Sequence, residues 1–214
     1  MVVQTSQNLT LRRAIAPDAD WAVPQLFAAG PALFSYIFAS PPAQAQQVLH
    51  QAFGLPQHAF SYEHTCIVEA EGHPTGLIIG YPSVAKKQAD EKVHLVMARI
   101  MPLRKLPAIL LNVADFSRIK QDVAPDTYYI LSLSVLPEFR QQGIGSHLLA
   151  WAETQALNSN CATICADVTY TNLAAKQLFE RRGYEIVCSK TTDRFEQMTR
   201  AGGLHRFSKP IIQT

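Results

Sequence analysis

The sequence predicts an α/β protein in which one mixed β-sheet is flanked by helices. In the C-terminal half, short apolar runs alternate with amphipathic runs in the order strand, helix, strand, helix, strand. Two earlier apolar runs are separated by a short turn and predict a hairpin. Strands that alternate with helices, beside a hairpin, are typical of a sheet with parallel and antiparallel pairs. The 214 residues suit a single domain, 1–214, with additions.

Composition narrows the classes of function. Hydrophobic residues make up 48% of the chain and charged residues 17%, as in an ordinary globular protein. The net charge of +2 gives no reason to expect a nucleic acid partner. No run of about 18 apolar residues predicts a membrane span, and the opening MVVQTSQNLTLRR lacks the apolar core of a signal peptide. We therefore expect a cytoplasmic protein with neither a nucleic acid nor a membrane as its partner.

The four cysteines show no metal-binding pattern. Cys66, Cys161, Cys165 and Cys188 include no CxxC pair, and no group of histidine and cysteine has zinc spacing. Cys161 and Cys165 lie in or beside the apolar run CATICADV. We expect buried thiols in a reducing compartment and no bound metal.

The first half of the chain predicts strands and helices in turn. Leu9–Ile15 is expected to be a short strand, and residues 17–30 a helix that Pro24 kinks or delays. Pro41–Phe53 is expected to be a second helix, with prolines in its first turn. Thr65–Ala70 and Thr75–Tyr81 are the two strands of the predicted hairpin, with EGHP as the turn.

Residues 83–127 are predicted to form a helical insert. The stretches VHLVMARIM and LPAILLNVADFSRIK are apolar enough to pack, and prolines separate them from their surroundings. A structureless loop of this length inside a compact domain would be unusual. We expect the insert either to wall a substrate site or to carry a homodimer contact.

The remaining elements follow from alternation and helix capping. Thr127–Leu136 is expected to be a strand with Tyr129, Leu131, Leu133 and Val135 on one face and Ile130, Ser132, Ser134 and Leu136 on the other. A helix begins near Ile144, and the run 162–168 reads as a buried strand. Asn172 caps a second helix that ends at Gly183. Residues 184–190 and 204–211 are expected to be strands that flank a flexible RAGG segment.

The loop RQQGIG, between the predicted strand and helix, has the chemistry of a phosphate site. Backbone N–H groups at a helix N-terminus favour anions. Gly143 and Gly145 let an anion approach the main chain, and Arg140 adds a forked cation suited to phosphate. The loop lacks the Gly-Lys-Ser/Thr of a P-loop and the third glycine of a dinucleotide-binding loop.

RQQGIG resembles the Arg/Gln-x-x-Gly-x-Gly/Ala motif of the GNAT superfamily of N-acetyltransferases. The surrounding LSVLPEFRQQGIGSHLLAWAE is similar to the family's fourth strand, pyrophosphate loop and third helix. TNLAAKQLFERRGYEIV resembles the segment that an asparagine opens and a Gly-aromatic pair closes, and LTLRRAIAPDAD resembles the opening strand and helix. The specific match covers 128–190, and the insert departs from the family's short connection.

The resemblance implies the GNAT fold and acetyl-CoA as cosubstrate. The expected sheet has about seven strands, is splayed between strands 4 and 5, and carries the helical insert before strand 4. In the family, the loop amides bind the pyrophosphate of acetyl-CoA. Carried onto this chain, the loop residues are Arg140, Gln141, Gln142, Gly143, Ile144, Gly145 and Ser146.

The resemblance also implies where the pantetheine arm and the thioester lie. The arm pairs like an extra strand with the backbone of Leu133, Ser134 and Val135. A backbone N–H at the bulge of this strand, that of Val135, is expected to polarise the thioester carbonyl. Asn172 reaches the pantetheine or a neighbouring group, and Phe179 lines the thioester end.

The acid and the base of the family are not evident in this sequence. Some relatives place a glutamate base where this chain has Tyr129, and many place a tyrosine acid where it has Phe179. Tyr170 is a substitute candidate for the acid, although a packed loop tyrosine is the alternative. Further candidates for a base are Glu69, Glu71 and His94. We assign none of them as the base, because surface groups of these types are usually solvated.

The leading hypothesis is an N-acetyltransferase that moves the acetyl group from acetyl-CoA to a primary amine by direct attack in a ternary complex. The acceptor is an amine of a small molecule or of a peptide or protein. The alternative is a catalytically weak GNAT-fold module that binds acyl-CoA or regulates. A nucleotide-binding module is a third hypothesis, which the absent P-loop lysine disfavours. The insert and residues 31–60 are expected to flank the acceptor site, and neither has an acidic cluster suited to a polyamine.

Overall fold

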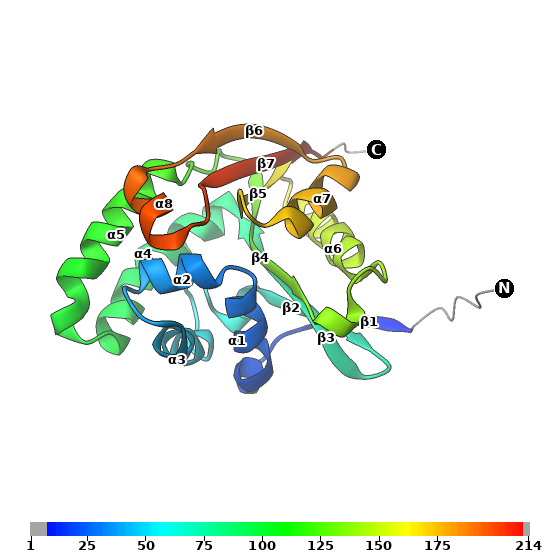
Figure 1. Cartoon of the computed structure of the whole chain (residues 1–214). Helices are drawn as coiled ribbons and strands as arrows, with labels where there is room; N and C mark the ends of the chain where they lie inside the picture. The colour runs from blue at the N-terminus through cyan, green and yellow to red at the C-terminus, as the bar shows by residue number, and fades with distance from the viewer. Residues whose placement is uncertain (1–7, 212–214) are drawn as a thin grey trace.

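The chain folds around one seven-stranded sheet with the order β1-β2-β3-β4-β5-β7-β6 (Figure 1). The structure is a computed structural model, and it describes residues 8–211, apart from the side chain of His94. The strands are β1 Leu9–Arg13, β2 Thr65–Ala70, β3 His73–Pro82, β4 Thr127–Val135, β5 Thr163–Thr169, β6 Glu185–Lys190 and β7 Leu204–Pro210. β4 and β5 are parallel, and every other neighbouring pair is antiparallel. The predicted mixed sheet is therefore confirmed.

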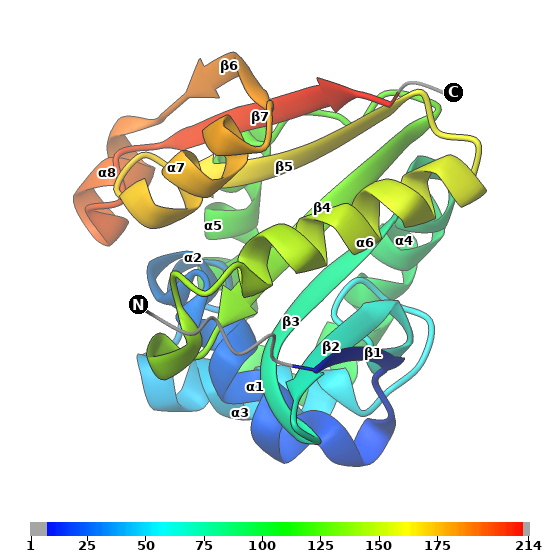
Figure 2. The ribbon, with the colours of Figure 1, turned by 90° about the vertical axis from the view of Figure 1, so that its right-hand side faces the viewer.

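Helices cover both faces of this sheet. They are α1 Ala19–Ala28, α2 Pro31–Ile37, α3 Pro42–Phe53, α4 Ser83–Ile100, α5 Leu106–Ile119, α6 Ile144–Asn158, α7 Leu173–Arg181 and α8 Asp193–Thr199. Short 3₁₀ turns lie at Ala16–Asp18, Tyr62–His64, Leu103–Lys105 and Pro137–Phe139. α6 and α7 pack on one face of the sheet (Figure 2), and α1, α3 and α4 pack on the other. Within residues 8–211, no helix combines the length and the apolar character needed to cross a membrane.

An apolar core lies on each face of the sheet, and a smaller third cluster includes Tyr36 of α2, Ile119 of α5 and Phe195 of α8. Leu26 of α1 and Leu49 of α3 pack with Ile79 of β3 on the first face. Leu148 of α6 and Ile78, the neighbour of Ile79, belong to the second core. Consecutive strand residues point to opposite faces, so β3 contributes to both cores, and it is apolar at most of its positions.

The sheet is splayed between its two parallel strands. β4 pairs with β5 only from Thr127 to Ile130, although β4 continues to Val135. Figure 2 shows the two strands diverging beyond the paired part. The predicted splay between strands 4 and 5 is thus confirmed, and it leaves one edge of β4 unpaired over half its length.

A β-bulge at Leu131 changes the alternation along β4. Ile79 of β3 lies opposite Ser132, and the next residue, Gly80, lies opposite Ile130, so Leu131 has no partner in the β3 ladder. Such a bulge adds one residue to one strand and moves the residues after it to the other face.

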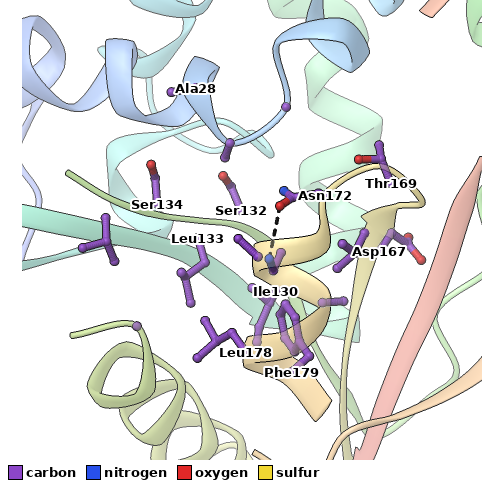
Figure 3. A pocket seen from close by; sticks show the side chains of 18 of the residues that line it. Ala28, Ile130, Ser132, Leu133, Ser134, Asp167, Thr169, Asn172, Leu178 and Phe179 are labelled. Carbon is purple, nitrogen blue, oxygen red and sulfur yellow. Dashed lines mark hydrogen bonds between the residues drawn. The ribbon is translucent and has the colours of Figure 1, made fainter. Parts of the chain in front are cut away.

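The predicted faces of β4 are therefore wrong beyond the bulge. Leu133 and Val135 pack with the core beneath α6, whereas Leu131 packs in the core beneath α1. Ser132 and Ser134 point toward α1 and Leu133 points away from it (Figure 3). An alternation counted along the sequence assumes one uninterrupted ladder, which β4 does not have.

The insert is helical, as predicted, and α5 is tied to α2 and α8. The Tyr36 hydroxyl of α2 and the Thr192 hydroxyl at the start of α8 both donate to Asp115 of α5, at 2.6 and 2.8 Å. Asn112 Nδ2 donates to the Tyr36 carbonyl at 2.7 Å. Asp115 and Asn112 are buried, so these bonds hold the insert against the two short helices.

Several expectations need correction. The hairpin turn is Glu71–Gly72, and β3 already begins at His73, because a bulge between Val68 and Glu69 accommodates Pro74 in the pairing. The short helices α2 and α8 were not expected, and the segment after α8 is packed: Ala201 is buried.

The thiols behave as predicted. Cys161 and Cys165 are free and buried, as is Cys66, while Cys188 is half-buried and accepts a bond from Gln121. Burial raises the pKa of the Cys165 thiol to about 12 and that of Cys66 to about 11. Such thiols stay protonated at neutral pH and act as small apolar side chains.

Candidate functional site

A cavity of about 1070 Å³ occupies the gap between β4 and β5. It is lined by the loop after β4, the first turn of α6, most of α7, the α1–α2 connection and the end of α8. Figure 3 shows side chains of β4, β5 and α7 converging on this space. The splay therefore creates a cleft directly beside the loop that the sequence marks as a phosphate site.

The N-terminus of α6 opens into this cavity. Gly143 is the N-cap of α6, has φ +85° and provides no capping side chain. A Cβ built on Gly143 would meet no atom within 4 Å, so this position borders open space. Gln141 also has a positive φ of 61°. The N–H groups of the first helical turn lack intrahelical acceptors, so the backbone here is suited to an anion.

Gly145 lies against a side chain of α7. A Cβ at Gly145 would lie 2.9 Å from Cδ2 of Leu178 on α7. The absence of a side chain thus leaves room for the Leu178 side chain against the first turn of α6. The sequence predicts that Gly145 keeps a side chain away from a bound diphosphate, and the contact with Leu178 is a second reason for glycine at this position.

The side chains of the loop after β4 differ in exposure and in their hydrogen bonds. Arg140 is exposed, and its Nε donates to the Val135 carbonyl at 3.1 Å. Gln142 Nε2 donates to the Glu138 carbonyl at 2.9 Å. Ile144 is buried in the core beneath α6, so only its backbone faces the loop. Of the predicted loop residues, Arg140, Gln141, Gly143, Gly145 and Ser146 line the cavity.

The unpaired edge of β4 presents backbone groups to the gap. Leu136 N–H donates to the Thr75 carbonyl at 2.9 Å, so this residue is bonded to the β3 side. Antiparallel pairing alternates, so Ser134 also bonds toward β3 while Val135 and Leu133 direct their N–H and C=O groups toward the gap. All three line the cavity, with Ser134 contributing its side chain. The bulge expected at Val135 lies at Leu131.

Asn172 and Phe179 lie on the α7 side of the cavity. Asn172 caps α7, with its Oδ1 accepting from Ala175 N–H at 3.1 Å (Figure 3). Phe179 lines the cavity but is almost fully buried, and its ring stacks on Phe207 and packs edge-on to Tyr184. Phe179 therefore contributes an apolar wall.

Tyr170 does not line the cavity. Its ring lies 4.2 Å from the His205 ring, and Cβ atoms built on Gly202 and Gly203 would come within 2.8 Å of Tyr170. Tyr170 is therefore packed in a loop, which is the alternative that the sequence offered to a role as the acid.

Two of the three candidate bases, Glu69 and Glu71, also lie outside the cavity lining, as does Tyr129, which stands where some relatives have a glutamate base. Tyr129 is buried and donates to Asp167 Oδ2 at 3.1 Å, and burial raises its pKa well above the usual value. Glu69 is paired with Arg12 at 2.6 Å. Glu71 is exposed in the hairpin turn. The backbone of His94 belongs to α4, and its side chain lies outside the described part of the structure.

Asp167 and Arg206 form a buried pair that the sequence analysis missed. Arg206 Nε and Nη2 donate to the two carboxylate oxygens of Asp167 at 2.6 and 2.8 Å, and Asp167 lines the cavity. Both side chains are under 10% exposed. The sequence does contain a signal for this pair. Asp167 lies inside the apolar run CATICADV and Arg206 inside the last predicted strand, and a buried charge requires a partner of opposite charge.

Ser132 is a second residue that sequence reasoning missed. It lines the cavity from β4 and is 8% exposed. Its Oγ is buried and has no hydrogen-bond partner in the part of the chain that the structure describes. A buried hydroxyl without a partner is unfavourable by about 1–3 kcal/mol, and it is therefore a ready partner for a polar ligand.

Known proteins resemble this chain over most of its length. An N-acetyltransferase from Staphylococcus aureus Mu50 is 17% identical, with a TM-score of 0.68 over 94% of this chain and 100% of that one. A crystal structure of an acetyltransferase is 21% identical, with a TM-score of 0.66 over 95% and 100% of the two chains. The ribosomal-protein-S18-alanine N-acetyltransferase from Escherichia coli is 15% identical, with a TM-score of 0.51 over 96% of each chain. At these identities the likeness shows a shared fold.

Sequence models of families give the decisive comparison. No curated protein matches the chain at a significant level. The model of the acetyltransferase (GNAT) family matches residues 32–184, which include β4, the phosphate-site loop, α6 and α7. The chain therefore belongs to the acetyltransferase (GNAT) family.

Proposed function

We propose that this protein is an N-acetyltransferase that uses acetyl-CoA and acts on a primary amine by direct attack in a ternary complex. One observation supports this most strongly: an open helix N-terminus and an unpaired strand edge border the same cavity. The first suits a diphosphate, and the second suits an extended arm that pairs like a strand.

The residues present fit acetyl-CoA. The backbone N–H groups from Gln141 to Ser146 would hold the pyrophosphate, with the Arg140 guanidinium beside them. The space at Gly143 leaves room for the phosphates. Backbone groups of Leu133 and the N–H of Val135 would face the pantetheine arm and its thioester, because the Val135 carbonyl accepts a hydrogen bond from Arg140. Asn172 lines the same cavity, and its amide nitrogen makes no hydrogen bond within the described residues.

The chain can assist acetyl transfer through its backbone and its apolar wall. Val135 N–H faces the gap and would polarise the thioester carbonyl as negative charge develops on its oxygen. Phe179 cannot donate a proton, so the departing thiolate would leave without a tyrosine acid. A thiol has a pKa near 8.5, which makes its thiolate a tolerable leaving group. An alkyl amine must lose a proton before attack, and water in the cleft would accept it.

The acyl-CoA-binding or regulatory module is the second candidate. It is favoured by Phe179 and Tyr129, because neither side chain can serve as the acid or base that relatives use. Both candidates predict CoA binding, and only the first predicts turnover with an amine. The free cysteines fit a reducing compartment, so the proposal includes a cytoplasmic location.

A substitution at Gly143 tests the phosphate site without removing the fold. Aspartate and asparagine are both good N-cap residues and tolerate positive φ better than most side chains. Gly143→Asp places a carboxylate at the proposed phosphate position, and Gly143→Asn is its neutral control. Calorimetry should show that the Asp variant binds CoA at least tenfold more weakly than the Asn variant, with similar melting temperatures.

Turnover separates the two candidates. Release of free CoA thiol is measured with acetyl-CoA and a panel of small amines and peptides. Thiol release that depends on the amine supports the enzyme. CoA binding without turnover on any amine supports the binding module, and equal affinity of the Asp and Asn variants would remove the phosphate site altogether.

A further inference from the structure

The cavity continues into a second space at the end opposite the phosphate-site loop. This second cavity, of about 580 Å³, lies between α2, α5 and α8. Pro31, Ala32 and Thr199 line both cavities, so the two spaces adjoin. If the loop end holds CoA, the acceptor must enter from this α8 end.

Charged side chains in the lining are almost entirely cationic. Among the described residues, Asp167 is the one carboxylate that lines either cavity, and Arg206 neutralises it through two bonds. Arg140 and Arg181 lie at the loop and α7 end, where CoA phosphates would be. The arginines at the acceptor end are Arg200 in the first cavity and Arg194 in the second.

Within residues 8–211, neither of the acceptor-end arginines forms an ion pair with an acid. Arg194 Nη2 donates to Asn112 Oδ1 at 2.7 Å, and Asn112 is itself buried and bonded to the Tyr36 carbonyl. This bond orients the Arg194 guanidinium before any ligand arrives. Arg200 is the C-cap of α8 and has φ +53°, a backbone conformation that residues other than glycine adopt at an energetic cost. Its guanidinium makes no hydrogen bond or ion pair within the described residues.

The opposite wall of the same end carries hydroxyls. Ser132 and Ser134 project from β4 toward α1, and the buried Ser132 Oγ has no partner in the described chain. A hydroxyl can accept a hydrogen bond from an ammonium or donate one to a free amine. The acceptor end thus offers neutral hydroxyls on β4 and cationic side chains on α8 and at its C-terminal end.

We propose that the acceptor is a small amine that also carries an anionic group, a carboxylate or a phosphate, and that Arg200 and Arg194 recognise this group while Ser132 contacts the amine. The inference rests on the proposed N-acetyltransferase function. Forked guanidinium groups suit both anions. Diamines and other polycations are disfavoured, because the other charged side chains of the lining are arginines, and the one carboxylate among the described lining residues, Asp167, is paired with Arg206.

Matched pairs of acceptors test this proposal. β-Alanine is compared with β-alaninamide, and aminoethyl phosphate with ethanolamine, at equal concentrations of free amine. We expect kcat/KM to favour the anionic member of at least one pair by tenfold or more, and putrescine to be a poor acceptor. The carboxylate and phosphate pairs identify which anion fits.

Three arginine variants locate the effect. Arg200→Gln should reduce the preference for the anionic acceptor at least fivefold, and Arg194→Gln should reduce it less. Arg118→Gln removes the same charge from α5 at an exposed position outside both cavities and should change nothing. Arg200→Glu should reverse the preference within each pair.

Binding provides a readout that does not need turnover. Calorimetry on the CoA-saturated protein should detect β-alanine or aminoethyl phosphate, and should detect weaker or no binding by the uncharged partners. Turnover of uncharged amines with equal or higher kcat/KM, unchanged by Arg200→Gln, would overturn the acceptor class and leave the acetyltransferase intact. CoA binding without turnover of any amine would instead count against the proposed function, and the calorimetric comparison would still decide the acceptor class.

Discussion

Gly145 offers a test that separates helix packing from ligand contact. A Cβ at this position would lie 2.9 Å from Cδ2 of Leu178, well inside an ordinary contact distance. Gly145→Ala must therefore move the Leu178 side chain or push α6 away from α7. Combining it with Leu178→Ala removes the clash and leaves the backbone of the loop unchanged.

The magnitude follows from two opposing effects. Overpacking costs about 1–3 kcal/mol where the neighbour cannot yield, and replacing glycine by alanine within a helix gains about 1 kcal/mol. In the wild-type background Gly145→Ala should destabilise the protein by about 0–2 kcal/mol. In the Leu178→Ala background the clash is absent, so the same change should stabilise it by up to about 1 kcal/mol. The sign of the effect should thus reverse, with a coupling of about 1–3 kcal/mol.

The assay is a double-mutant cycle read twice, by denaturant unfolding and by calorimetry with CoA. Because Leu178 also lines the cavity, CoA affinities are compared within each background. The packing role predicts that CoA affinity in the double variant matches that in Leu178→Ala alone. Additive free energies of unfolding, together with the same loss of CoA affinity from Gly145→Ala in both backgrounds, would show that the Cβ obstructs the diphosphate and that the packing explanation is wrong.

Four further outcomes follow from the site and the core. Arg140→Ala should weaken CoA binding by about 1.5–3 kcal/mol, the range for a hydrogen bond to a charged group, as measured by calorimetry. Tyr170→Phe should keep kcat within about tenfold, roughly 1.4 kcal/mol of barrier, because its ring packs outside the cavity. Burial lowers the pKa of His58 below its usual 6.5. The free energy of unfolding should therefore keep its full value above pH 6.5 and decrease by at most about 1.4 kcal/mol per pH unit as the pH falls toward the pKa of the folded state. His58→Asn should flatten this part of the plot of stability against pH. Asp167→Asn should destabilise the protein by about 3–5 kcal/mol, because Arg206 would remain buried without its counter-charge, and thermal melting would measure the loss.

Each of these outcomes has a clear opposite. Unchanged CoA affinity in Arg140→Ala would place the arginine outside the phosphate site. A thousandfold loss of kcat in Tyr170→Phe with unchanged CoA affinity would make Tyr170 the acid. The same pH profile with and without His58 would assign the acid sensitivity elsewhere. A fully stable Asp167→Asn would mean that Arg206 reaches solvent or another partner.

The segment from β4 to α7 was predictable because its signals are local. Alternation marks the strand, Gly143 marks the start of α6, and Asn172 caps α7 where the sequence places it. Each of these features depends on neighbours within a few residues in the chain, so a single sequence contains the necessary information.

The acceptor end was not predictable for the opposite reason. The short helices α2 and α8 are held by bonds from distant residues, such as those of Tyr36 and Thr192 to Asp115 in the insert. Helices of one or two turns have little stability of their own, so their sequences carry weak signals. The Asp167–Arg206 pair likewise joins residues on two strands that only the sheet order brings together.

The bulge at Leu131 links these two parts of the site. Without the bulge, uninterrupted alternation of the same residues would turn Ser132 and Ser134 toward the apolar core beneath α6 and away from the cavity. Leu133 would then face the cavity on the α1 side. The bulge reverses these faces just where β4 parts from β5, so the same few residues present backbone groups to the gap and hydroxyls to the acceptor end. The bulge therefore determines both the strand edge proposed for the pantetheine arm and the polar surface proposed for the amine.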